Sequence, residues 1–338
     1  MADCGAGGDN HPNGPLQARP GVAWAGLEVI HSPGDNPTPK ADPVSDTSSP
    51  RGPLRRILEA SRPARPWQDG DQLPWSDPAF SRRMLDVHLD PATHMASRAP
   101  DVIRAHVDWL LEQLKARAGT PGPWRVLDVG CGPGLYVHEL AARGHAGCGF
   151  DFAPAPLRWA RDHAVANSLD AVFLEADLTA LPGDFAALAG APFDAVTFWF
   201  GEFHSFRPEQ ARAFLPRLAS LLRPGGLFVL EYQPWDLFVK EDAATWSAVD
   251  SSPFGARPHL WLEEFAWDEE ARAEIHVHWI VDADTGETSR FAQCNQAWQD
   301  DELLDALAAA GIADVRTHPP ITGVADEFEF PVLVGKRS

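Results

Sequence analysis

Short apolar runs alternate with helical repeats over the middle of the chain. Five strand-like runs cover Val126–Val129, Ala146–Phe150, Ala171–Glu175, Phe193–Trp199 and Leu227–Glu231. Between them, apolar residues recur at helical spacing, which predicts helices over Leu135–Arg143, Pro156–Asn167 and Pro208–Leu222. The segment Arg223–Gly226 predicts a turn into the fifth strand. This alternation indicates a parallel sheet covered by helices on both sides.

The pattern changes after Tyr232. Strand-like runs over His259–Phe265, Ala273–Val281 and Thr288–Cys294, with a hairpin loop at Asp282–Gly286, predict an antiparallel β insertion over residues 234–297. A helix over Asp301–Ala310 and strands over Val315–Thr317 and Phe330–Val334 are then expected in residues 298–338. We therefore predict an α/β fold with a doubly wound, mostly parallel seven-stranded sheet. Residues 122–233 are its ligand-binding core.

The N-terminal part has two different patterns. Residues 1–55 are rich in Pro, Gly, Asp and Ser and hold only short apolar pieces, so we expect a disordered tail. From Leu54 to Ala118 the pattern becomes helical, with one amphipathic segment around Phe80 and Met84 and another from Val102 to Leu114. Residues 56–121 are therefore predicted to form a helical cap before the first strand of the core.

Composition narrows the classes of partner. The chain has 28 basic and 48 acidic residues, a formal net charge of -20, which disfavours nucleic acid as a partner. Its four cysteines are scattered without a C-x-x-C pair, which fits a reducing compartment better than a disulfide or zinc scaffold. No apolar run approaches the roughly 20 residues that cross a bilayer, and no signal peptide is visible. We therefore expect a cytoplasmic protein without a membrane partner; its oligomeric state stays open.

The most informative motif is the run Val126–Gly134. It predicts a buried strand, a turn with glycines at 130, 132 and 134, and a helix whose free N–H groups suit an anionic ligand. Its G-x-G-x-G spacing is shorter than the usual dinucleotide fingerprint. Asp151 ends the second strand, close to the roughly 20-residue separation expected for an acid that binds a ribose diol. A lone Asp after a strand is more often a turn or cap residue, so the ordered set of motifs has to carry the assignment.

That ordered set also includes Asp177, Phe193–Val196 and Leu222–Leu227. It resembles motif I and the following motifs of class I S-adenosylmethionine (SAM)-dependent methyltransferases, which have a Rossmann-like fold, and the resemblance covers about residues 122–336. It implies SAM as the methyl donor and a small organic molecule as the acceptor. The cofactor-binding residues we expect are Asp128, Gly130, Cys131, Gly132, Gly134, Asp151, Phe152, Asp177, Leu178 and Phe200. Asp177 would accept from the adenine amino group, whereas Asp128 could instead organise the glycine loop.

Candidate catalytic residues follow strands four and five. Glu202, His204 and Tyr232 lie where strand ends line the ligand crevice of a doubly wound sheet. A base is needed only if the acceptor must lose a proton, and each residue also has a purely structural interpretation. In related methyltransferases the N-terminal region forms a lid, which suggests that Arg98 pairs with the SAM carboxylate or the substrate. A solvated arginine at a helix end is an equally good interpretation.

Other interpretations of the sequence stay open at this point. His276 and His278 lie on one strand face and could suit a metal, but without a third ligand a polar strand face is the better interpretation, and we expect no metal site. The alternatives for function are a protein methyltransferase acting on a basic peptide, an NAD(P)-dependent oxidoreductase and a SAM-binding protein without catalysis. The sequence does not identify the acceptor atom.

Overall fold

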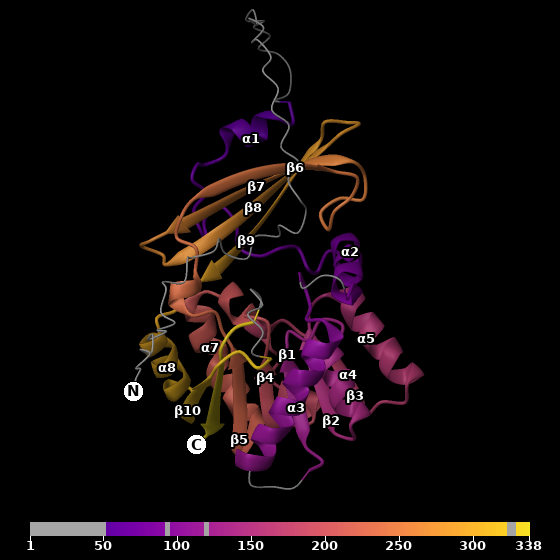
Figure 1. The fold of residues 1–338 in the computed structure, drawn as a ribbon, viewed down its shortest axis with the longest axis vertical. Helices are drawn as coiled ribbons and strands as arrows, with labels where there is room; N and C mark the ends of the chain where they lie inside the picture. Colours follow the sequence, from indigo (N-terminus) through magenta and orange to yellow (C-terminus); the bar gives the residue numbers. More distant parts are fainter. Residues whose placement is uncertain (1–51, 92–94, 118–121, 323–328) are drawn as a thin grey trace, which may run out of the picture.

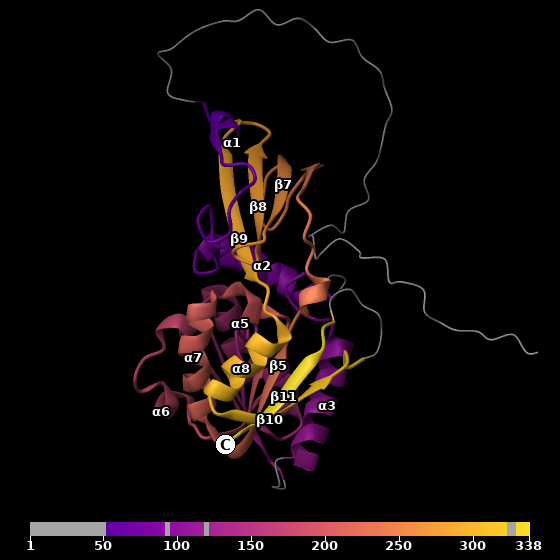
Figure 2. The ribbon, with the colours of Figure 1, turned by 90° about the vertical axis from the view of Figure 1, so that its left-hand side faces the viewer.

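The computed structural model describes residues 52–91, 95–117, 122–322 and 329–338. Most of the predicted N-terminal tail therefore lies outside the described residues. The core is one seven-stranded sheet in the order β10-β11-β5-β4-β1-β2-β3 (Figures 1 and 2). Its strands are β1 (Arg125–Val129), β2 (Ala146–Asp151), β3 (Ala171–Glu175), β4 (Phe193–Phe198), β5 (Leu222–Glu231), β10 (Ile312–His318) and β11 (Val332–Arg337). The predicted seven-stranded α/β fold is confirmed.

The strand order places a ligand crevice. β1 pairs in parallel with both β2 and β4, so the chain winds outward from β1 in two directions. β11 pairs antiparallel with both β5 and β10, which makes the sheet mixed at that edge. In such sheets ligands bind outside the carboxyl ends of the strands, at the point where the winding direction changes. That point here is the gap between the ends of β1 and β4.

Side chains alternate along each strand, so apolar residues lie on both faces of the core sheet. On one face Leu127 and Phe198 pack with α6 (Phe185–Ala189), α7 (Pro208–Leu221) and α8 (Asp300–Ala309). On the other, Val126 and Ala195 pack with α3 (Pro100–Arg117) and α4 (Leu135–Ala142). α5 (Pro154–Ala166) packs with α4 and β3 on that second face. Burial on both faces explains why the core strands read as continuous apolar runs.

The insertion forms a second, antiparallel sheet in the order β6-β7-β8-β9, beyond one end of the core (Figure 1). Its strands are β6 (Ala243–Val249), β7 (His259–Asp268), β8 (Ala273–Asp282) and β9 (Thr288–Gln296). One face buries Ile275, Val277 and Trp279 against Ala64 and its neighbours after α1 (Arg55–Glu59). The opposite face carries polar side chains, including Glu274, which β8 alternation places on the other side from Ile275.

Three local predictions are corrected. Residues 60–77 are not helical, because prolines at 63, 66 and 74 interrupt the segment before α2 (Pro78–Leu89). The predicted turn Arg223–Gly226 lies within β5 as an irregularity in its pairing with β4, and Gly225 has a φ of 75°. β6 was not predicted, because it is a largely exposed edge strand without a buried repeat.

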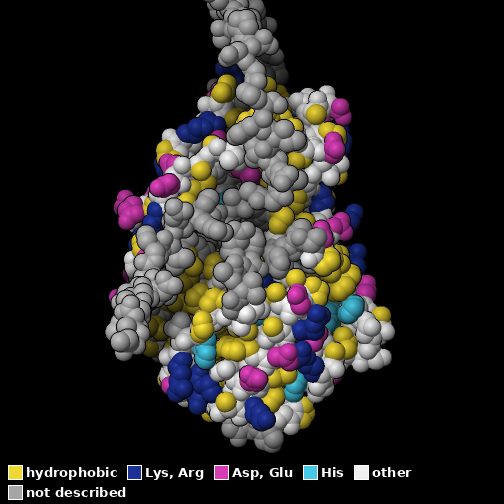
Figure 3. Space-filling view, viewed as in Figure 1, with side chains coloured by type: hydrophobic (Ala, Val, Ile, Leu, Met, Phe, Trp, Pro, Cys, Tyr) yellow, Lys and Arg dark blue, Asp and Glu magenta, His cyan; other side chains and the backbone are white. Residues whose placement is uncertain are grey.

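Acidic and basic side chains are interspersed over the surface of the core on the face shown in Figure 3, so the negative net charge does not form one acidic block there. Among the described helices, none combines the length and the apolar character needed to cross a membrane.

Candidate functional site

A cavity of about 1090 Å³ lies where the winding of the core sheet changes direction. The glycine turn after β1, the ends of β2 and β4, the segment around α2 and the polar face of the insertion sheet all contribute to its lining. Pockets that hold one drug-sized ligand usually measure roughly 300–1,000 Å³. The cavity therefore has room for a nucleotide-sized ligand together with a second, smaller molecule.

The glycine turn is built as the sequence predicts. Gly130, Gly132 and Gly134 have φ values of 64°, 51° and 72°, which L side chains rarely adopt. A Cβ on Gly134 would lie 2.3 Å from Phe173 Cε1, so this glycine lets α4 pack against β3. Gly130, Cys131 and Gly132 line the cavity, but Gly134 does not. Gly134 therefore has a packing role in this fold, and its predicted contact with the cofactor stays a prediction.

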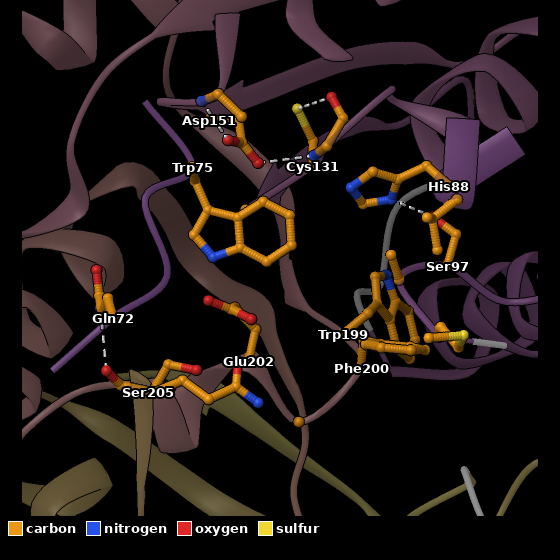
Figure 4. Close-up of a pocket in the computed structure, with 18 of the residues that line it drawn as sticks. Gln72, Trp75, His88, Ser97, Cys131, Asp151, Trp199, Phe200, Glu202 and Ser205 are labelled. Atoms are coloured by element: carbon orange, nitrogen blue, oxygen red, sulfur yellow. Dashed lines mark hydrogen bonds between the residues drawn. The ribbon is translucent and has the colours of Figure 1, made fainter. Parts of the chain in front are cut away.

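Asp151, not Asp128, organises the glycine turn. Asp151 Oδ2 accepts from the Gly132 N–H at 2.8 Å, and Oδ1 accepts from the Ala153 N–H at 2.8 Å. Asp128 accepts instead from the Thr197 hydroxyl at 2.9 Å and is almost fully buried. Burial raises the pKa of Asp151, and it raises the pKa of Asp128 to about 7. Both carboxyl groups line the cavity (Figure 4 labels Asp151).

The third strand contributes the far rim of this half of the cavity. Asp177 Oδ1 caps the short helix η1 (Leu178–Ala180) by accepting from the Thr179 N–H at 2.8 Å and the Thr179 hydroxyl at 2.7 Å. Asp177 is exposed and lines the cavity, with Oδ2 turned to no partner among the described residues. Phe152 and Leu178 line the cavity beside it. Asp177 is therefore both a cap residue and available to a ligand.

Arg98 enters the cavity as a buried cation. Its Nη2 donates to Glu231 Oε1 at 2.5 Å, and both side chains are almost fully buried. The guanidinium carbon lies 4.6 Å from the centre of the Phe200 ring, and the Phe200 N–H donates to Glu231 Oε2 at 2.6 Å. Arg98 Nε and Nη1 are buried without a hydrogen-bond partner in the described structure. Because buried donors are rarely left unpaired, these two N–H groups indicate a missing anionic or carbonyl ligand.

Of the three predicted catalytic residues, Glu202 presents its carboxyl group to the cavity, where it is also hydrogen-bonded with Ser205. It belongs to the short helix η2 (Glu202–Ser205), and Figure 4 shows its carboxyl group near Trp75, on the same side as Gln72 and Ser205. Burial, followed by the negative charge of Asp151, raises the pKa of Glu202 to about 8. An empty cavity therefore holds much of this carboxyl group in its protonated form at neutral pH.

His204 and Tyr232 are used differently. His204 Nδ1 donates to the Gln296 carbonyl at 2.7 Å, and Nε2 accepts from the Gln233 N–H at 2.9 Å, so both ring nitrogens are occupied. Burial lowers the pKa of His204 to about 4. Tyr232 belongs to the hydrophobic core and does not line the cavity. In the described structure His204 joins η2 to β9 and Tyr232 packs in the core, so these contacts do not favour either residue as a base, and their catalytic role stays a prediction.

Several lining residues were not predicted as site residues. Trp75 and His88 come from the two ends of the α2 region, and Tyr136 comes from the first turn of α4. His88 Nδ1 is paired with the Ser97 hydroxyl at 2.8 Å (Figure 4), and burial lowers the pKa of His88 to about 4. Glu231 was also missed. Its signal was an acid at the end of an otherwise apolar strand, whereas nothing in the local sequence of Trp75 or His88 marks them.

The insertion sheet supplies the polar wall opposite the core. Glu274, Gln293 and Asn295 line the cavity, and Glu274 Oε1 accepts from Asn295 Nδ2 at 2.8 Å. His276 lies on the same face with Nε2 3.3 Å from Glu274 Oε1, and His278 Nδ1 accepts from Trp261 Nε1 at 3.1 Å. The part of the chain that the structure describes contains no group of three or more His, Cys, Asp or Glu side chains able to hold a metal ion.

Comparisons with known proteins identify the core. Residues 126–226 match the family model described as a methyltransferase domain. A demethylmenaquinone methyltransferase of Thermus thermophilus is 43% identical over 115 residues, which cover 33% of this chain and 49% of the relative. Residues 126–226 therefore form a methyltransferase domain. A ubiquinone biosynthesis O-methyltransferase of Xanthomonas campestris is 36% identical over 120 residues, covering 36% and 47% of the two chains.

The chain spans about half the length of the curated relatives that it matches. Among solved structures, the CcbJ methyltransferase from Streptomyces caelestis superposes with a TM-score of 0.56 at 19% identity, covering 77% of this chain and 98% of that one. A SAM-dependent methyltransferase from Clostridium acetobutylicum has a TM-score of 0.53 at 13% identity, covering 69% and 90%. At these identities the structural likeness concerns the fold.

Proposed function

We propose that this protein is a class I SAM-dependent methyltransferase that transfers a methyl group from SAM to a small organic molecule bound between the core and the insertion sheet. The observation that carries the proposal is the buried, half-satisfied Arg98 beside the glycine turn. Together with the acids at the ends of β2 and β3, it supplies a complementary group for each polar part of SAM. The family supports the donor, and the cavity supports a second ligand.

The residues present fit SAM part by part. Arg98 Nε and Nη1 suit the methionyl carboxylate, and the backbone of Gly130–Gly132 can lie against the methionyl chain. Asp151 has carboxylate lone pairs beyond its two backbone bonds, which suit the ribose diol. Asp177 Oδ2 and the adjacent Leu178 and Phe152 suit the adenine. Glu202 then lies beside the glycine turn, where the reactive end of the donor is expected, since a Cβ on Gly130 would be 3.6 Å from Glu202 Cγ.

The chain's own contribution to the reaction is positioning, charge and exclusion of water. When bound, SAM supplies an electrophilic methyl group on a positively charged sulfur. The carboxyl groups of Asp128, Asp151 and Glu202 favour positive charge in the cavity, because burial has raised their pKa values and a nearby cation would lower them again. Trp75 and Phe200 provide aromatic faces on which such a cation is also stabilised. Holding donor and acceptor together accounts for much of the rate of a displacement reaction.

A small acceptor follows from the construction of the cavity. Its walls come from the core, the α2 region and the insertion sheet. We further infer a cytoplasmic location, which the scattered cysteines support, and no nucleic acid partner, which the net charge supports.

Calorimetry with SAM and with S-adenosylhomocysteine tests the donor assignment. We expect Asp151→Asn to weaken SAM binding at least about tenfold, because the amide has fewer lone pairs for the ribose diol, whereas a charge-assisted bond contributes about 1.5–3 kcal/mol. The matched control is Asp170→Asn, an exposed position before β3 that does not line the cavity. Absence of SAM binding by the wild-type protein would refute the proposed function. Equal binding by Asp151→Asn would refute only the ribose assignment.

A further inference from the structure

The cavity as a whole is acidic. Eight acidic residues line it, of which Asp128, Asp151 and Asp177 are on the donor side, whereas Arg98 is the one Arg or Lys among the described lining residues, and its charge is already matched by Glu231. The two lining histidines have lowered pKa values, so they add no positive charge at neutral pH. The acidic lining residues are Asp71, Asp86, Asp90, Asp128, Asp151, Asp177, Glu202 and Glu274.

Two of these acids reach the cavity from different parts of the fold. Glu274 is the second residue of β8 and is 5% exposed, and the hydrogen bonds that it accepts from His276 and Asn295 both end on Oε1. Glu202 comes from η2, which packs against β9, the strand paired with β8. The bond from His204 to the Gln296 carbonyl joins η2 to the end of β9. The fold therefore braces the loop that carries Glu202 against the sheet that carries Glu274.

The remaining wall of this space is rich in amides and aromatic carbon. Gln72 donates to the Ser205 carbonyl at 3.0 Å, and Gln293 and Asn295 line the cavity from β9. Trp75 stands beside Glu202 in Figure 4. A buried carboxylate is unfavourable unless a cation or hydrogen-bond donors accompany it. An ammonium group offers three donors and a positive charge, and a tryptophan face stabilises it further.

We propose that the methyl acceptor is a basic amine, received between the Glu202 and Glu274 carboxyl groups. The inference rests on the proposed function and names its substrate class. An anionic acceptor would meet several negative charges, and a neutral alcohol would leave the buried carboxylates without a cation. The polar wall also disfavours an acceptor molecule whose reacting end is purely hydrocarbon.

The reaction balances with the groups present. Ionised Glu202 takes one proton from the bound ammonium, which frees the nitrogen lone pair. That pair forms the new C–N bond while the methyl C–S bond breaks, and its electrons stay on sulfur in neutral S-adenosylhomocysteine. The product is a methylated ammonium, and the proton on Glu202 passes to water. Glu274 takes no part in the proton transfer and holds the positively charged nitrogen.

The test uses matched acceptors with the full chain. Three carbon skeletons, each prepared as the primary amine, the alcohol and the carboxylic acid, are titrated into the complex with S-adenosylhomocysteine and assayed for methylation with SAM. We expect the amine of each set to bind at least tenfold more tightly than its alcohol, a difference of about 1.4 kcal/mol. The amines should also be the ones methylated. Equal or tighter binding of the alcohols or acids would overturn the inference, as would methylation at oxygen or carbon in preference to nitrogen.

Two variants tie the preference to these residues. Glu274→Gln and Glu202→Gln should each raise the KM of the amine at least tenfold, while in Glu274→Gln the Kd of SAM changes less than threefold. The exposed Glu241→Gln, outside the cavity, is the matched control. Melting temperatures distinguish a folding defect from lost recognition of the amine. Glu202→Gln is a second test, because Glu202 takes no part in the hydrogen bonds of β8. Unchanged amine KM in both folded variants would refute the assignment, whereas loss of SAM binding in the wild type would refute the proposed function itself.

Discussion

The Arg98–Glu231 pair provides the sharpest test of how the site is built, because one arginine has two separable tasks. Its bond to Glu231 belongs to the fold, whereas its unpaired Nε and Nη1 point to a ligand. Replacing Arg98 by Met removes both tasks at once. Replacing Glu231 by Gln removes only the internal partner. The double variant Arg98→Met with Glu231→Gln removes the buried pair together.

The burial of both side chains sets the magnitudes. Removing one partner of a buried ion pair costs about 3–5 kcal/mol, because the other charge stays behind. Glu231 would then keep only the N–H groups of Phe200 and Phe330 as donors. Removing both partners is often nearly neutral. The double variant should therefore recover most of the free energy of unfolding that Arg98→Met loses.

SAM affinity should follow a different order. Both variants without Arg98 lose charge-assisted bonds to the carboxylate, about 1.5–3 kcal/mol, so their Kd rises roughly 10- to 150-fold. Glu231→Gln leaves a buried guanidinium without its counter-charge, so it should bind SAM at least as tightly as the wild type. Urea unfolding and calorimetric titration with SAM measure the two quantities independently. Wild-type SAM affinity in the stable double variant would refute the ligand role of Arg98 and leave it a structural residue.

Three further predictions concern single residues. Gly134→Ala should destabilise the protein by roughly 2–4 kcal/mol, because the added Cβ meets Phe173 and the φ of this residue is positive. The control Gly144→Ala also has a positive φ but faces open space, so it should cost about 1 kcal/mol. Equal melting temperatures of the two variants would contradict the packing role of Gly134. The pKa of Asp128 is about 7 in the fold against an ordinary value of 3.8. Its contribution to the free energy of unfolding, about 4 kcal/mol, is therefore complete below pH 3.8 and is lost as the pH rises to 7. Between pH 5 and 8 the melting temperature of Asp128→Asn should fall less than that of the wild type, and parallel curves would refute this. The kcat/KM for an amine should rise with pH through the Glu202 pKa of about 8, and this ionisation should disappear in Glu202→Gln; an unchanged profile would exclude Glu202 as the base.

The success of the sequence predictions differs between the donor and acceptor sides. Gly130, Asp151 and Asp177 could be proposed from the sequence because each lies in a short run at the end of a strand. Every predicted donor-side residue except Gly134 lines the cavity. The sequence could not show which contacts His204 and Tyr232 make, because proximity to a strand end does not reveal where a side chain points. One turned to the backbone of Gln296 and Gln233, and the other turned into the core.

The sequence by itself determined the seven-stranded core, its glycine turn and the resemblance of that core to methyltransferase domains, because these depend on local periodicity and on motifs of a few residues. Only the tertiary structure decided which acids share the cavity and which are consumed by the fold. Asp151 bonds the glycine turn, Arg98 meets Glu231 from 133 positions along the chain, and Glu274 reaches the substrate space from the insertion. Burial and pairing of charges depend on contacts between segments distant in sequence, and those contacts exist only once the two sheets are packed together.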